Sequence, residues 1–147
     1  MAILDQITSD MKEAMKRQDA VARDTLRMIK TDASRRELEL GRPLEDGEVM
    51  EVLLRAVKTR RESLEQYTEG GRADLAEKEQ SEIAIIEAYL PKAMDEDAAR
   101  EAVRAIAAEL GVTSKKDMGK VMKEVTARFK GQIEGKLASK LAGEILS

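Results

Sequence analysis

The chain has 147 residues, of which 42 % are apolar and 37 % are charged, and its net charge is −3. It contains no Cys and no His, which excludes disulfides, thiolate nucleophiles and every catalytic triad that needs an imidazole. Only Tyr67, Tyr89 and Phe129 are aromatic, so the core must be built from aliphatic side chains, which favours packed helices over sheets.

Apolar residues recur at helical spacing along the first part of the chain and predict four helices there. The second of these helices is expected to end at Gly41, because glycine readily adopts the left-handed conformation of a helix cap, and to turn inward Val21, Ala22, Leu26, Ile29 and Ala33. Asp46 is expected to cap the third and longest helix, which Gly70–Gly71 ends. The fourth helix follows directly and is closed by Pro91.

Pro91 is also the predicted domain boundary, because the residue before a proline is disfavoured in a helix. Beyond it the helical pattern restarts, with Asp95 in the place of an N-cap, and three further helices are predicted. The sequence therefore predicts an all-α protein. We expect an N-terminal antiparallel helical bundle over residues 1–91 and a small three-helix C-terminal domain over residues 92–147.

Ser114 and Asp117 have the spacing of a capping box at the start of the helix that carries Met118–Phe129. Gly119 falls inside this helix, where glycine costs about 1 kcal/mol relative to alanine. We expect a neighbouring helix to pack closely on Gly119, and the alternative is the close approach of a ligand backbone. The turn Gly131–Gly135 does not have the spacing of a nucleotide-binding loop, so we predict no nucleotide hydrolysis.

Cations cluster in the C-terminal part of the chain. Residues 113–136 contain seven basic and three acidic side chains, which reverses the acidic balance of the chain as a whole. Lysines at helical spacing can face a polyanion together, although runs of charge are more often a solvated helix face, and both readings stay open. The predicted phosphate-binding residues are Lys115, Lys116, Lys120, Lys123, Arg128, Lys130 and Lys136.

A second set of basic residues lies in the first part of the chain: Arg23, Arg27, Lys58, Arg60, Arg61 and Arg72. These side chains could form a secondary basic patch, but ion pairing with acidic residues of the same or neighbouring helices is the preferred interpretation. Glu79 and Glu82 stand three residues apart and could share a metal or act as an acid–base pair. No further ligand supports them, so we predict no metal, no cofactor and no catalytic residue.

The chain resembles the YqeY-like family over nearly its whole length. The motifs that carry the resemblance are Lys58–Tyr67, Gly71–Ala76 with Glu79 and Glu82, Tyr89–Pro91, and Met118–Met122. The resemblance implies an all-helical bundle followed by a small helical domain. It also implies similarity to the C-terminal tail of the B subunit of the glutamine-dependent tRNA amidotransferase, which contacts tRNA while amide transfer takes place elsewhere.

One turn departs from the family's pattern, in which the turn before the last helix reads Gly-Arg-Ala-Asp-Gly. Here Gln132 replaces the basic residue, and Glu134 replaces the aspartate, which is the better N-cap. This departure weakens the case for a dedicated phosphate contact at this turn.

These observations predict a non-catalytic binding module that associates with tRNA. The small number of aromatic residues excludes a base-stacking platform, so we expect contacts to the backbone and to the shape of a folded RNA. One alternative is an adaptor that binds an amidotransferase or an aminoacyl-tRNA synthetase. Another, which the missing nucleophile disfavours, is a carbon–nitrogen ligase with glutamine as amide donor. No apolar run could span a bilayer and no signal peptide is evident, so we expect a cytoplasmic location and no membrane partner; the oligomeric state is not predicted.

Overall fold

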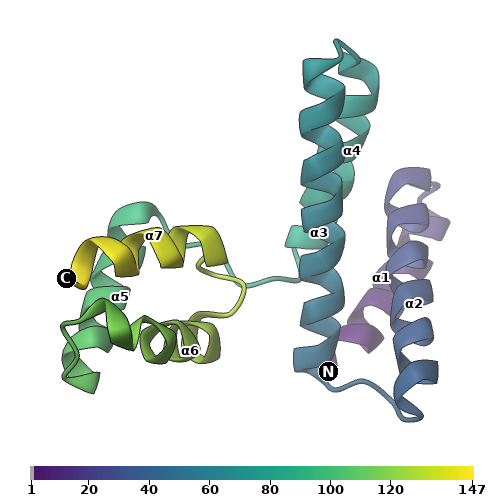
Figure 1. The fold of residues 1–147 in the computed structure, drawn as a ribbon. Coiled ribbons are helices and arrows are strands. Elements are labelled where there is room, and N and C mark those ends of the chain that lie inside the picture. The colour runs from purple at the N-terminus through teal and green to yellow at the C-terminus, as the bar shows by residue number, and fades with distance from the viewer. Residues whose placement is uncertain (1) are drawn as a thin grey trace. The chain divides into compact units, whose positions relative to one another are not determined.

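The structure is a computed structural model that describes residues 2–147, and over these residues the only regular secondary structure is helical. The prediction of an all-α protein is confirmed. The α-helices are α1 (Ile3–Lys16), α2 (Ala20–Leu40), α3 (Asp46–Glu69), α4 (Ala73–Glu87), α5 (Glu96–Leu110), α6 (Met118–Phe129) and α7 (Gly135–Ile145). A short 3-10 helix, η1 (Lys115–Asp117), precedes α6 (Figure 1).

The chain separates into two compact units, which we call the N-terminal unit, up to Leu90, and the C-terminal unit, from Pro91 onward. In the N-terminal unit α3 and α4 form an antiparallel hairpin, and α1 packs on α2 (Figure 1). The helix α2 also contacts α4 and, less extensively, α3. Ile7, Ile29, Leu53 and Ile86 are completely buried at the centre of this unit, one from each helix.

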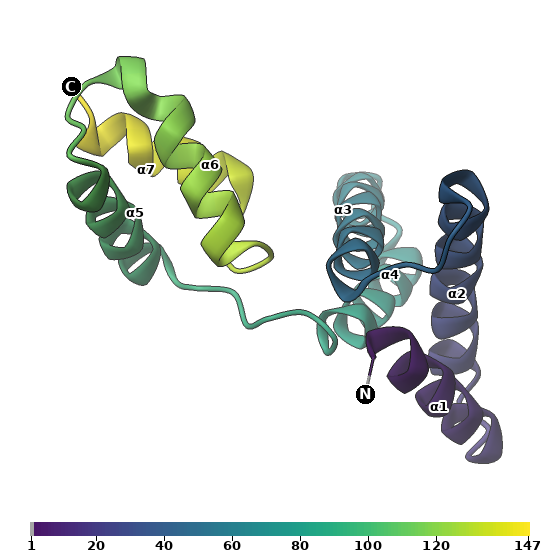
Figure 2. The ribbon, with the colours of Figure 1, turned by 90° about the horizontal axis from the view of Figure 1, so that it is seen from below.

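In the C-terminal unit each of the helices α5, α6 and α7 packs against the other two, as Figure 2 shows. Their apolar stripes meet in a core that includes Val103, Val121 and Leu141, each 0 % exposed. Two backbone hydrogen bonds fix Ser147 to the segment before α6. The N–H of Ser147 donates to the carbonyl of Thr113 at 2.8 Å, and the N–H of Lys115 donates to the carbonyl of Ser147 at 3.2 Å. The last residue therefore closes the unit against the loop before η1.

Some predicted helix caps are observed and others are not. The side chain of Asp95 accepts a hydrogen bond from the N–H of Ala98 at 2.7 Å, as predicted. Asp46, in contrast, is the first helical residue of α3, and its carboxylate accepts from the N–H of Ile3 at 3.1 Å. The prediction for Asp46 is wrong because α3 starts one residue earlier, with Glu45 as N-cap. Asp46 instead links the beginnings of α1 and α3.

The start of α6 also differs from the predicted capping box. Ser114 accepts from the N–H of Lys116 at 3.3 Å and so caps η1 rather than α6. Asp117 is the N-cap residue of α6, but its side chain makes no capping hydrogen bond there. The cause is the extra 3-10 turn, which separates the Ser114 side chain from the first residues of the helix.

Candidate nucleic-acid interface

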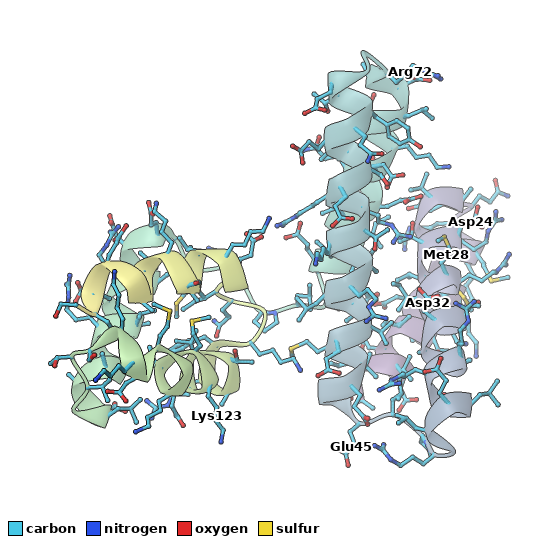
Figure 3. The ribbon with its side chains drawn as sticks, viewed as in Figure 1. Asp24, Met28, Asp32, Glu45, Arg72 and Lys123 are labelled. Atoms are coloured by element: carbon cyan, nitrogen blue, oxygen red, sulfur yellow. The ribbon has the colours of Figure 1, made fainter. Side chains whose placement is uncertain are left out.

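The outward face of η1 and α6 carries the cations that the sequence singled out. Val121 and Val125 turn into the core of the C-terminal unit, which leaves Lys120 and Lys123 exposed on the opposite side of α6. Lys116 is also exposed, but it lies in η1 and not on α6 itself. Figure 3 shows the Lys123 side chain extending outward from α6. We call Lys116, Lys120 and Lys123 the lysine face.

The charges of most predicted phosphate-binding lysines are not compensated by a neighbouring carboxylate. Within residues 2–147, the side chains of Lys115, Lys116, Lys123 and Lys136 form no ion pair and are exposed. Lys120 approaches Asp117, with 3.6 Å between Nζ and Oδ1, while 72 % of its side chain remains exposed. Such exposed pairs contribute only about 0–1 kcal/mol, so Lys120 can exchange this partner for another anion.

Arg128 differs from these lysines. Its Nη1 lies 2.7 Å from a carboxylate oxygen of Glu109, and its Nε lies 3.1 Å from one of Glu124. Hydrogen bonding to Glu109 is the largest cause of the raised pKa of Arg128. Two carboxylates therefore already engage this guanidinium, which links α5 to α6 and contributes little net positive charge to the surface.

Gly119 is the second residue of α6, and the structure overturns the explanation that we gave for it. A Cβ atom built on Gly119 would meet no atom within 4 Å, so no helix packs closely there. The prediction fails because Gly119 faces outward, beside Lys120 and Lys123, and not toward α5 or α7. The alternative, the close approach of a ligand backbone, stays a prediction.

The remaining predicted cations flank the turn before α7: Lys130 is the C-cap residue of α6, and Lys136 is the second residue of α7. Glu134 is the N-cap residue of α7, but its side chain makes no capping hydrogen bond, as expected for a residue that is longer than aspartate. The carbonyl of Gln132 accepts from the N–H of Met94 at 2.9 Å, which anchors the segment before α5. This turn thus has a structural task, and the exposed Lys136 follows it in α7.

The secondary basic residues are spread over the N-terminal unit. Most of them meet a carboxylate: Arg60 pairs with Glu82 (3.0 Å), Arg61 with Glu87 (3.4 Å), Arg23 with Asp24 (2.9 Å) and Arg72 with Asp74 (3.4 Å). Figure 3 shows Arg72 at the tip of the α3–α4 hairpin and Asp24 on α2. Arg27 and Lys58 form no ion pair within the described residues.

Arg60 is the buried member of this set, and its pair with Glu82 links α3 to α4. Glu82, which the sequence set beside Glu79 as a possible metal ligand, is thus already paired with Arg60. Over residues 2–147 the structure contains no group of three or more acidic residues arranged to hold a metal ion. None of the helices described is both long and apolar enough to cross a membrane.

One feature that the sequence did not reveal is a cleft of 470 Å³ between α2 and α3. Met28 stands at this cleft with 49 % of its surface exposed, although its neighbours Leu26 and Ile29 are buried in the core. The available signal was an apolar residue that lies off the stripe formed by Leu26 and Ile29. The cleft lies where α2 packs less on α3 than on α1 and α4, and this arrangement has no signature in the sequence.

Comparison with known proteins identifies the family. The family described as Yqey-like protein matches residues 4–146. The chain belongs to the YqeY-like family. Similar curated proteins share the name "Altered inheritance of mitochondria protein 41, mitochondrial". The relative from Eremothecium gossypii is 32 % identical over 103 residues, which cover 67 % of this chain and 56 % of that protein. The relative from Clavispora lusitaniae is 34 % identical over 99 residues, or 65 % of this chain and 58 % of that protein.

A third YqeY-like relative, from Pyrenophora tritici-repentis, matches 98 % of this chain at 24 % identity and 81 % of its own length. The chain spans about half of the length of the two more similar relatives. Because these proteins are named as mitochondrial, they overturn the cytoplasmic location expected from the sequence. That expectation failed because it relied on the absence of apolar segments, and mitochondrial targeting sequences are amphipathic rather than apolar.

Proposed function

We propose that this YqeY-like chain is a non-catalytic binding module that binds tRNA through the lysine face of its C-terminal unit. The observation that carries the proposal is the set of exposed cations on η1, α6 and α7 that lack a carboxylate partner within the described residues. A lysine without a partner can neutralise a phosphate and release a counterion, whereas an arginine held by two carboxylates gains little by doing so.

The position of Gly119 supports the same proposal. It provides a place beside the lysine face where no side chain separates the helix backbone from an incoming molecule. Glycine is favoured where another backbone approaches closely, and its cost in a helix is otherwise unexplained here. With no aromatic residue on this face, contacts would be made to the phosphates and to the shape of the RNA.

In this proposal the two units have separate tasks. The N-terminal unit would be the bundle that carries the interface, and the C-terminal unit would be the three-helix domain that contains it. An adaptor that binds an amidotransferase or an aminoacyl-tRNA synthetase is the second candidate. Such an adaptor would contact its partner through a surface suited to protein, and not through the basic lysine face. A ligase with glutamine as amide donor has no support from any group of residues described above.

The test is binding of bulk tRNA to the purified protein across a salt series, with the variant Lys116/Lys120/Lys123→Ala beside the wild type. We expect the logarithm of the binding constant of the wild type to fall steeply with the logarithm of salt concentration. The variant should lose about one unit of this slope for each phosphate contact removed, or about three units.

The matched control is Lys12/Lys58/Lys78→Ala, which removes the same charge from exposed positions of the N-terminal unit. It should retain the slope of the wild type. If the two variants lost the same amount of salt slope, binding would depend only on the total charge of the protein. If only the control lost slope, the interface would lie on the N-terminal unit. Absence of binding by the wild type at low salt would refute the proposal and favour the adaptor.

A further inference from the structure

The cleft between α2 and α3 has the size of a ligand site. Its volume of 470 Å³ falls within the range of about 300–1,000 Å³ that is typical of binding pockets. The cleft is formed by two helices that each pack more extensively on other helices than on one another. The side chains that line it are Met28, Asp32, Arg35, Arg36 and Glu39 from α2, and Glu48, Glu51, Val52, Arg55, Ala56, Thr59 and Arg60 from α3.

Arg60 brings unused hydrogen-bond donors to this cleft. Its side chain is only 9 % exposed; its Nε donates to Glu82 at 3.0 Å and its Nη1 to the carbonyl of Ala56 at 3.2 Å. Its Nη2 points to the sulfur of Met28 at 3.6 Å. A guanidinium has five N–H groups, so two have no partner among the described residues. A third has only a thioether, which is a weak acceptor.

Met28 covers this guanidinium from the opposite helix. It lies one turn before Asp32 on α2, as Figure 3 shows, and it is half exposed although its sulfur meets Arg60. Methionine is unbranched and flexible, and it adapts to different partners. A carboxylate that displaced the sulfur would form a charge-assisted hydrogen bond, which is shorter and stronger than the present contact.

Arg55 supplies a guanidinium that could receive such a carboxylate. It is exposed and forms no ion pair with any described residue, whereas Arg35 meets Asp32 at 3.9 Å and Arg36 meets Glu39 at 2.9 Å. Four acidic residues nevertheless line the cleft, as many as the arginines. A cleft without net charge opposes a polyphosphate chain, whereas the unpaired Arg55 and the spare donors of Arg60 suit a ligand with one or two carboxylates beside apolar groups.

We propose that this cleft binds a short acidic, amphipathic segment of a partner protein. In this arrangement a Glu or Asp of the segment is received by Arg55 and by the free N–H groups of Arg60. An apolar side chain one helical turn away packs on Met28, Val52 and Ala56. A peptide fits better than a compact small molecule because the apolar and charged groups extend along both helices rather than converging on one point.

The experiment follows the methionine methyl groups by NMR in the full-length protein labelled at the Met Cε. The probe is a synthetic helical peptide of about twelve residues with Leu and Glu one turn apart, beside a matched peptide in which each Glu is Gln. We expect the Met28 methyl resonance, identified by its loss in Met28→Leu, to shift and saturate with the Glu peptide. Met15, which is 50 % exposed and does not line the cleft, should not shift.

Two variants test whether the Glu carboxylate of the peptide binds at Arg55. Arg55→Gln should weaken binding of the Glu peptide about tenfold, while Arg61→Gln, an exposed position on the same helix that does not line the cleft, should leave it unchanged. The proposal is overturned if the Gln peptide binds equally well, if Arg55→Gln has no effect, or if Met28 does not respond at millimolar peptide. It is also overturned if free glutamate shifts Met28 as strongly as the peptide, or if only tRNA does.

Discussion

The two units of the molecule use arginine and lysine differently, and the difference explains where their free charge lies. In both units arginines link helices, as Arg60 does to Glu82 in the N-terminal unit and Arg128 to Glu109 in the C-terminal unit. Lysines form few ion pairs in either unit, and they gather on one face only in the C-terminal unit. The planar guanidinium suits fixed pairing, whereas the flexible ammonium stays hydrated. A count of all Lys and Arg residues therefore overstates the size of a binding surface, because it includes arginines that already pair with carboxylates.

The largest effect that we expect concerns whether the two units are independent. Leu141 is completely buried in the C-terminal unit, and Leu141→Ala should cost about 3 kcal/mol because it leaves a cavity. That is most of the stability of a unit of this size. Tyr67 and Tyr89 both lie in the N-terminal unit, and the chain has no Trp. Tyrosine fluorescence should therefore show an unchanged melting transition while circular dichroism shows early loss of helix.

The control for this prediction is Ile86→Ala, which removes a completely buried side chain from the N-terminal unit. It should lower the transition seen by tyrosine fluorescence by a similar free energy. If Leu141→Ala lowers the tyrosine transition as much as Ile86→Ala does, the units unfold together and the separate roles proposed for them lose their basis.

The next effect in size concerns the buried ion pair of the N-terminal unit. Arg60→Met leaves Glu82 as an uncompensated carboxylate that is only 14 % exposed, and it should cost about 2–3 kcal/mol in chemical denaturation. Arg60→Met/Glu82→Leu should recover most of this loss, because replacing a whole buried pair by apolar side chains is often neutral. The adjacent pair of Arg61 with Glu87 is exposed, so Arg61→Met should cost under about 1 kcal/mol.

Sequence patterns predicted the helical class, the cap at Asp95 and the burial of the main apolar stripes, because these depend on local spacing. They failed at Val21, which was predicted to face inward and is 44 % exposed, and at Asp46, whose cap position shifted by one residue. They also failed at Gly119, which faces outward instead of packing against a helix. The pairing of Arg128 with Glu109 joins residues 19 apart in sequence, so only the packed structure reveals that this cation is already engaged. The cleft at Met28 depends on how α2 and α3 pack in the folded unit, which local spacing does not encode.

An acid-sensitive contribution should appear in the N-terminal unit. The pKa of Glu48 is lowered from 4.5 to about 2, first by hydrogen bonding to the guanidinium of Arg42 and then by the N–H of Glu45. A lowered pKa in the folded state stabilises that state above the unfolded value. The stabilisation is therefore complete above about pH 5 and disappears as pH falls from 4.5 toward 2.

Melting curves followed by tyrosine fluorescence test this dependence. Glu48→Gln should melt at a lower temperature than the wild type at pH 7, and the difference should vanish near pH 2, where the wild-type carboxylate becomes protonated. Glu65→Gln makes the same change of charge at an exposed position of α3 and should not alter the slope of stability with pH. A constant difference between Glu48→Gln and wild type at all pH values would contradict the assignment.

The smallest expected effect compares two glycines in equivalent places. Gly47 is the second residue of α3 and Gly119 the second residue of α6, and a Cβ on either would meet nothing within 4 Å. Changing either residue to Ala should therefore stabilise its own unit by about 0.5 kcal/mol, since alanine loses less backbone entropy in a helix. Only Gly119→Ala should weaken tRNA binding, severalfold, because its methyl group would separate α6 from a phosphate backbone beside the lysine face. If both variants bind tRNA like the wild type, the RNA contacts lysine side chains without approaching the helix backbone, and Gly119 then has no part in the interface.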